Sequence, residues 1–279
     1  QLDAAVECYE KAIAIQPDYA EAHYNLGNAL KELGQWEDAV KSYEKALTLK
    51  PDYAKAHNNL GIALKELGQL DAAAESFEKA LAINPDYAEA LNNLGNAFNQ
   101  LGQLDAAVKC YEKAIAVNPD YAKAHNNLGI AFKQLGQLDE ALASYESAIA
   151  LDPELDLLLG FSLNTKMHLG IWDDYANQLN ELTNKVNNGK KALDPFTMIA
   201  LIDDPGIQKK TAEIYVDSSY PQNHFLPKIE RYPKHKKIRI GYFSADFRDH
   251  PVAYLTAELY EMHDRERFEI HAFSFGPDT

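Results

Sequence analysis

A 34-residue period constrains the fold of this chain more than any other feature. Prolines recur at that interval, and four of the five open the same tetrapeptide, Pro-Asp-Tyr-Ala: Pro17, Pro51, Pro85, Pro119 and Pro153. Between consecutive prolines the same two amphipathic helical patterns return. A unit of two antiparallel helices can bury its apolar face only against its neighbours. The period therefore predicts an all-α solenoid with a long concave surface.

Small and aromatic residues at fixed positions support close pairing of these helices. The first helix of each unit carries a glycine (Gly27, Gly61, Gly95 and Gly129), and the second carries an alanine (Ala39, Ala73, Ala107 and Ala141). Rings at Tyr43, Phe77, Tyr111 and Tyr145 are expected to fill the space between neighbouring repeats. A two-helix period of this length is typical of tetratricopeptide repeats. The predicted fold is therefore an all-α tetratricopeptide-repeat superhelix over residues 1–152.

The ends of the array differ from its middle. Residues 1–16 match a second helix only, so the chain is expected to begin with a half repeat, followed by four 34-residue repeats, as a fragment with further repeats upstream. Residues 153–186 form a degenerate capping repeat, in which Leu163 and Tyr175 replace the small glycine and alanine. These larger residues predict a looser helix pair that ends the solenoid.

Composition excludes several classes of function. The net charge of −15 argues against nucleic acid as the main partner, because a phosphate backbone attracts a basic surface. No apolar run approaches the length of a membrane span, so no membrane is expected to be involved. Cys8 and Cys110 form no disulfide framework, which predicts a reducing, cytoplasmic location.

One position of the first helix forms a candidate binding row: Asn25, Asn59, Asn93 and Asn127. An asparagine amide holds a donor and an acceptor, so the row could bind the main chain of an extended peptide whatever its side chains. The alternative is a solvated polar face without a partner. A second row, His23, His57 and His125, is interpreted as packing or capping, because its spacing has no metal-ligand geometry.

The 34-residue repeat pattern ends at Val186, and a different sequence pattern follows. Residues 187–236 are expected to form a helical transition, with short helices starting at Asp194 and Pro205, and then a solvated linker. Residues 237–243 (KIRIGYF) and 268–275 (FEIHAFSF) have the character of strands, with a helical pattern between them. This order predicts a Rossmann-like βαβ unit, so residues 237–279 are expected to begin a truncated α/β domain.

The segment IRIGYFSADFRDHPVAYL, followed by MHDRERFEIHAFSFGPD, resembles the start of the catalytic region of O-linked N-acetylglucosamine transferases and their SPINDLY relatives. The resemblance implies a family 41 type, two-lobed GT-B core behind tetratricopeptide repeats, with residues 237–279 opening its N-terminal lobe. It also implies an active-site role for His250, as a general base or a positioning group. The alternative is that His250 only caps the following helix.

The resemblance implies a protein-substrate-recruiting repeat region and the start of a protein O-glycosyltransferase that moves N-acetylglucosamine from UDP-N-acetylglucosamine to Ser or Thr. The chemistry would be inverting, without a metal or a cofactor besides the donor, and this fragment is expected to be inactive alone. Expected partners are proteins or extended peptides on the concave surface. The alternatives are fucose as the donor sugar, a non-catalytic interaction scaffold, and a chaperone adaptor that clamps a carboxylate. The asparagine row argues against the last, which would need Lys and Arg on the concave helix.

Overall fold

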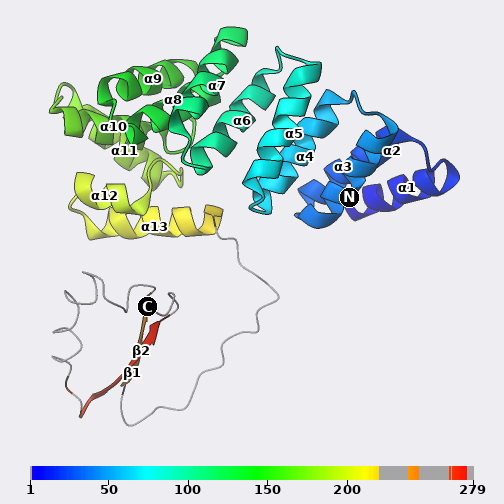
Figure 1. Ribbon diagram of the computed structural model, residues 1–279. Helices are drawn as coiled ribbons and strands as arrows, with labels where there is room; N and C mark the ends of the chain where they lie inside the picture. The colour runs from blue at the N-terminus through cyan, green and yellow to red at the C-terminus, as the bar shows by residue number, and fades with distance from the viewer. Residues whose placement is uncertain (1, 220–237, 245–263, 265, 275–279) are drawn as a thin grey trace. The chain divides into compact units, whose positions relative to one another are not determined.

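The computed structural model describes residues 2–219, 238–244, 264 and 266–274. The chain divides into two compact units, Gln1–Gln222 and Asn223–Thr279. In the first unit, consecutive antiparallel helices stack into the expected repeat superhelix (Figure 1). Its described helices are α1 (Leu2–Ile15), α2 (Ala20–Glu32), α3 (Trp36–Leu49), α4 (Ala54–Glu66), α5 (Leu70–Ile83), α6 (Ala88–Gln100), α7 (Leu104–Val117), α8 (Ala122–Gln134), α9 (Leu138–Leu151), α10 (Leu158–Leu169), α11 (Tyr175–Asn187), α12 (Pro195–Leu201) and α13 (Pro205–Ser219).

The first helices of the four regular repeats, here called the A helices, are α2, α4, α6 and α8; the second or B helices are α3, α5, α7 and α9. Each A helix ends in the same way. In α2, the Gln35 N–H donates to the Leu30 carbonyl at 2.9 Å and the Gly34 N–H donates to the Lys31 carbonyl at 3.0 Å. Gly34 has φ 72°, and this left-handed residue closes a Schellman turn. The Leu-Gly-Gln of each repeat therefore sets the turn into the B helix.

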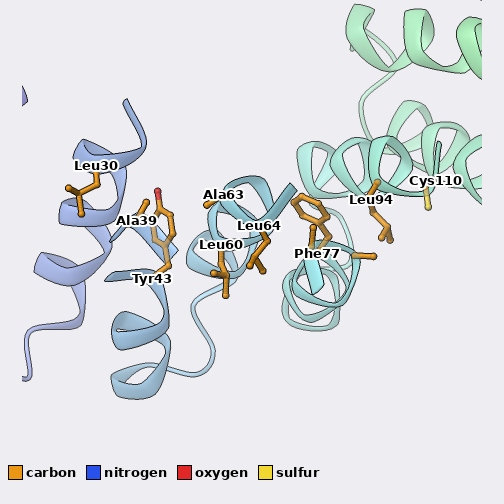
Figure 2. Packing of buried hydrophobic residues seen from close by; sticks show 12 residues of the cluster. Leu30, Ala39, Tyr43, Leu60, Ala63, Leu64, Phe77, Leu94 and Cys110 are labelled. Carbon is orange, nitrogen blue, oxygen red and sulfur yellow. The ribbon is translucent and has the colours of Figure 1, made fainter. Parts of the chain in front are cut away.

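The core of each repeat is built around a ring that lies over a glycine. A Cβ atom added at Gly27 would lie 2.6 Å from Cε1 of Tyr43, so only glycine leaves room for this ring. Tyr43 is fully buried, in a cluster that also contains Leu60 and Ala63 of the next repeat (Figure 2). The rings thus pack inside their own helix pair as well as toward the neighbouring repeat, which the sequence expectation had left out.

The fifth helix pair has a different geometry. The helices α10 and α11 touch each other much less than the A and B helices of a regular repeat do. Instead, the Leu157 N–H donates to the Lys191 carbonyl at 2.8 Å, and the Gly160 N–H donates to the Ala192 carbonyl at 3.2 Å. An extended segment therefore covers the first turn of α10. The looser pair expected from Leu163 and Tyr175 is confirmed.

Two helices follow, as expected: the short α12 and the 15-residue α13. The Asp194 carboxylate accepts the Thr197 N–H at 2.9 Å and Pro195 occupies the first turn, so α12 has a complete N-cap. The α13 helix begins at Pro205, where the Asp204 carboxylate accepts the Gly206 N–H at 2.7 Å. Among the helices of the described residues, none has both the length and the apolar character needed to span a bilayer.

The described residues of the second unit contain β1 (Ile238–Ser244) and β2 (Phe268–Ser274). They pair in parallel, with Ile238 opposite Phe268 and Ser244 opposite Ser274. The two strands expected at residues 237–243 and 268–275 are confirmed to within one residue. Most of the expected connecting helix and the turn that contains His250 lie outside the described residues. The assignment of this unit to a GT-B lobe stays a prediction.

Candidate functional site

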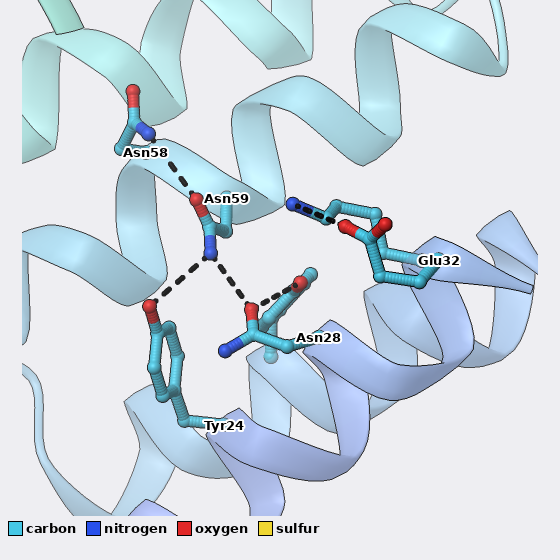
Figure 3. A network of polar contacts seen from close by, with 7 residues as sticks. Tyr24, Asn28, Glu32, Asn58 and Asn59 are labelled. Atoms are coloured by element: carbon cyan, nitrogen blue, oxygen red, sulfur yellow. Dashed lines mark hydrogen bonds and ion pairs between the residues drawn. The ribbon is translucent and has the colours of Figure 1, made fainter. Parts of the chain in front are cut away.

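The four asparagines of the predicted row lie one on each A helix, and all four are partly exposed: Asn25, Asn59, Asn93 and Asn127. Asn59 shows how the row is held (Figure 3). Its Nδ2 donates to the Tyr24 hydroxyl at 3.2 Å and to Oδ1 of Asn28 at 2.8 Å, both on the preceding A helix. The side chain therefore connects two repeats.

The same connection recurs along the row. Nδ2 of Asn127 donates to Oδ1 of Asn92 at 2.9 Å and to Oδ1 of Asn96 at 3.0 Å, while Nδ2 of Asn93 donates to Oδ1 of Asn58 at 3.0 Å. The NH2 groups of Asn59 and Asn127 each make two hydrogen bonds inside the protein, so these two side chains have no donor left for a ligand, whereas the NH2 group of Asn93 makes one. Within the described part of the chain, no donor reaches Oδ1 of Asn93 or Asn127, so each can offer this oxygen to a ligand as an acceptor.

A second set of polar residues was not found from the sequence. Oδ1 of Asn96 also accepts the hydroxyl of Tyr111 at 2.8 Å, and Oδ1 of Asn28 accepts that of Tyr43 at 2.9 Å. These bonds tie the row to the buried rings of the B helices. A partial signal was present in the sequence: Asn28 and Asn96 occur with tyrosine and Ile62 occurs with Phe77, but Ile130 occurs with Tyr145.

A pocket of about 220 Å³ opens between α4, α6 and α8. Its lining combines Lys65, several side-chain amides, one ring and one aliphatic residue: Lys65, Asn96, Asn99, Gln100, Tyr111, Asn127 and Ile130. Nζ of Lys65 lies 3.0 Å from a carboxylate oxygen of Glu66, its neighbour in sequence. Asn127 of the row is thus part of a pocket wall that also holds an ammonium group.

The row ends at the fifth repeat, where Phe161 takes the asparagine position. Nζ of Lys133 lies 5.9 Å from the centre of the Phe161 ring and donates to Oδ1 of Asn164 at 2.6 Å. Burial lowers the pKa of the Lys133 ammonium, although the Asp194 carboxylate acts in the opposite direction. The Lys133 ammonium therefore already has its partners within the protein.

The histidine row has the structural role expected of it. Nε2 of His23, His57 and His125 lies 2.9–3.0 Å from the carbonyl oxygen of Pro17, Pro51 and Pro119, respectively. Each imidazole therefore holds the turn that precedes its own A helix. His250, the predicted catalytic residue, lies outside the described residues.

Comparison with known proteins agrees with this division. Models of the tetratricopeptide repeat match residues 1–34, 27–68, 63–102, 95–136 and 122–155, and the model described as glycosyl transferase family 41 matches residues 212–279. A relative from Arabidopsis thaliana, "Probable UDP-N-acetylglucosamine--peptide N-acetylglucosaminyltransferase SEC", is 35% identical over 48 residues. That match covers 17% of this chain and only 5% of the relative.

Solved structures resemble the repeat region. MamA is 30% identical with a TM-score of 0.52, and the match covers 55% of this chain and 89% of MamA. The pilus biogenesis factor PilW has a TM-score of 0.62 at 22% identity, covering 68% of this chain and 89% of PilW. YrrB, described as a TPR protein with an unusual peptide-binding site, has a TM-score of 0.53 at 22% identity, covering 75% of this chain and 99% of YrrB. PilW and YrrB are informative for the fold alone.

Proposed function

Because the chain belongs to the tetratricopeptide-repeat proteins and its last 68 residues match the family 41 glycosyltransferases, we propose that it recruits the protein substrate of a protein O-glycosyltransferase. The repeats bind the acceptor protein on the face of the A helices. Residues 237–279 open the catalytic region. The donor is UDP-N-acetylglucosamine and the acceptors are Ser and Thr hydroxyls, a choice supported by the short match to the Arabidopsis protein.

The asparagine row carries this proposal. Oδ1 of Asn93 and of Asn127 can each accept a main-chain N–H, a group that every residue except proline presents. The row therefore suits an extended segment of any sequence. Each such bond contributes about 1 kcal/mol net, so binding is weak and depends on several repeats acting together.

A peptide-binding measurement tests the row. The probe is a fluorescein-labelled, acetylated and amidated 20-residue peptide of Ser, Thr, Val and Pro. Replacement of Asn59, Asn93 and Asn127 together by alanine should raise its dissociation constant by about tenfold or more, because the open acceptors of Asn93 and Asn127 are lost. Fluorescence anisotropy measures the change.

The triple variant also loses hydrogen bonds between repeats, so it needs a control of similar stability. The pair Asn28→Ile with Tyr43→Phe supplies it, because it copies the Ile62 and Phe77 of the next repeat and breaks the bond from Asn59 without removing a row residue. The control should bind the peptide as wild type does. Equal affinity of the triple variant and wild type would show that the row is a solvated polar face that does not bind the peptide.

His250 is proposed as the group that accepts the acceptor hydroxyl's proton, or that positions the reacting groups. The reaction is inverting and uses neither a metal nor a further cofactor. In a form of the protein that transfers the sugar, His250→Ala should lower kcat by about 10²–10⁴-fold. Activity that persists in His250→Asn would indicate positioning instead of proton transfer, and full activity in both variants would leave His250 as a turn residue.

Two other functions can be distinguished from this proposal by the donor sugar that is used and by whether any sugar is transferred. Transfer from GDP-fucose in place of UDP-N-acetylglucosamine would identify a SPINDLY-type enzyme. Peptide binding without transfer from either donor, in the full-length protein, would identify an interaction scaffold.

A further inference from the structure

Three lysines share one position of the A helices, but each faces a different residue of the next repeat. The residue 31 positions after Lys31 is Ile62, after Lys65 it is Asn96, and after Lys133 it is Asn164. For Lys133 this residue is the internal partner, because the ammonium donates to Oδ1 of Asn164 at 2.6 Å. That pair is satisfied within the protein.

At Lys65 the equivalent pair cannot form in the same way. Oδ1 of Asn96 already accepts two donors, the hydroxyl of Tyr111 at 2.8 Å and Nδ2 of Asn127 at 3.0 Å. Only the NH2 group of Asn96 remains, and among the described residues it has no acceptor. Lys65 and Asn96 both line the pocket between α4, α6 and α8. The ammonium of Lys65 and the NH2 group of Asn96 are both donors, so neither can accept a hydrogen bond from the other.

Charge on this face also favours an anion. The helices α4, α6 and α8 together carry four lysines, Lys55, Lys65, Lys123 and Lys133, and two glutamates, Glu66 and Glu89. The B helices α5, α7 and α9 carry more acidic than basic residues, so they and not these A helices contribute to the net charge of −15. At the position of Glu66, the next two repeats have Gln100 and Gln134. These A helices therefore carry a net positive charge, and Lys65 is the one charged residue among the described residues that line the pocket.

Among the described residues, Glu66 holds the only carboxylate within 4 Å of Nζ of Lys65. The Glu66 side chain is 42% exposed, whereas that of Lys65 is 23% exposed. A pair between adjacent, partly exposed residues contributes little to stability. Lys65 can therefore share its ammonium protons with a second carboxylate that enters the pocket.

We infer that this pocket selects an acidic residue of the bound peptide, with Lys65 and the NH2 group of Asn96 donating to the Asp or Glu carboxylate. The inference rests on the proposed function, because it assumes an extended peptide on the A-helix face. Ile130 provides an apolar wall for the methylene groups of the acidic side chain, and a volume of about 220 Å³ accommodates it. The sequence argument against a carboxylate clamp rested on the asparagine row and did not consider Lys65.

Anisotropy measurements with the Ser, Thr, Val and Pro peptide test the inference. A single Asp, Asn or Lys is placed in turn at each position of the acetylated and amidated peptide. For wild type at low salt, Asp in one register should bind about tenfold more tightly than Asn, because a charged acceptor strengthens the hydrogen bonds. Lys65→Gln should abolish the preference for Asp while leaving the affinity for the Asn peptide unchanged.

Lys31→Gln is the matched control. Lys31 has the same local arrangement, an ion pair with the adjacent Glu32 and a side chain 23% exposed, but Ile62 stands where Asn96 stands. This variant should keep the preference for Asp. An equal loss in both variants would overturn the inference and indicate only a general effect of charge.

The remaining outcomes separate the inference from the proposed function. Binding of the uncharged peptide with no preference for Asp in any register would overturn the acidic pocket and leave peptide recruitment intact. A carboxylate preference that appears only with a free C-terminus would also overturn it, in favour of a terminal clamp. Failure of every peptide to bind would overturn both.

Discussion

At the residue scale, the hydroxyls of the buried tyrosines distinguish repeats that are otherwise alike. The hydroxyls of Tyr43 and Tyr111 donate to Asn28 and Asn96. Tyr145 has Ile130 at the equivalent place, and its fully buried hydroxyl has no hydrogen-bond partner among the described residues. An unsatisfied buried hydroxyl costs stability, whereas a satisfied one contributes a modest net amount.

Replacing each tyrosine by phenylalanine should therefore have different results. Tyr111→Phe should lower the free energy of unfolding by about 1 kcal/mol, because a buried hydrogen bond to Asn96 is lost. Tyr145→Phe should be neutral or stabilising, since it removes only an unpaired hydroxyl and copies Phe77. Urea denaturation of the two variants measures the difference, and equal destabilisation by both would refute this assignment.

Only part of the geometry of the asparagine row could be predicted from the sequence. The asparagine row could be read from its period alone, because one position per repeat becomes a row in space. The direction of its amides could not, since it depends on contacts with Tyr24, Asn28, Asn92 and Asn96 of neighbouring helices. The period alone also does not distinguish Lys65 from Lys31 and Lys133, because the bonds open to each lysine depend on the residue at the facing position of the next repeat.

At the scale of the helices, the distance between an A helix and its B helix is set by one missing methyl group. A Cβ atom at Gly95 would lie 2.5 Å from Cε1 and 2.8 Å from Cδ1 of Tyr111. Alanine has the better helix propensity, by about 1 kcal/mol, but overpacking a core costs about 1–3 kcal/mol. The cost of overpacking is therefore expected to exceed the gain in helix propensity at Gly95.

Gly95→Ala should destabilise the repeat region, as measured by its thermal midpoint or by urea denaturation. The same substitution in a Tyr111→Leu background should be neutral or mildly stabilising, because the ring is gone and only helix propensity remains. The double-mutant cycle isolates this coupling. A Gly95→Ala variant as stable as wild type, with Tyr111 in place, would show that the ring does not set the spacing.

The helices themselves follow closely from local signals. The Leu-Gly-Gln turns, the Asp194-Pro195 cap of α12 and the start of α13 at Pro205 are all encoded by a few adjacent residues. The packing of residues 191–193 on α10 could not be predicted, because it depends on Gly160, a residue without a counterpart of the same role in the regular repeats. A Cβ atom at Gly160 would collide with Cδ1 of Leu193.

At the scale of the whole molecule, the chain consists of a repeat region and a C-terminal segment that matches the family 41 glycosyltransferases. The repeat region is a solenoid whose stability combines the packing inside each repeat with the interfaces between neighbouring repeats. Its A-helix face combines the asparagine row with the pocket that Lys65 lines, while its B helices carry much of the negative charge. The family 41 match covers residues 212–279, and the proposed recruitment of protein substrates would give the two parts one function.

The most direct test of that claim is the position of a bound peptide on the repeats. A photo-crosslinking amino acid is placed at Gln100, exposed at the pocket on α6, or at Glu112, exposed on α7. After irradiation with the Ser, Thr, Val and Pro peptide, mass spectrometry should detect a cross-link from position 100 and none from position 112. A cross-link from position 112 alone would place the peptide on the B helices and contradict recruitment by the asparagine row.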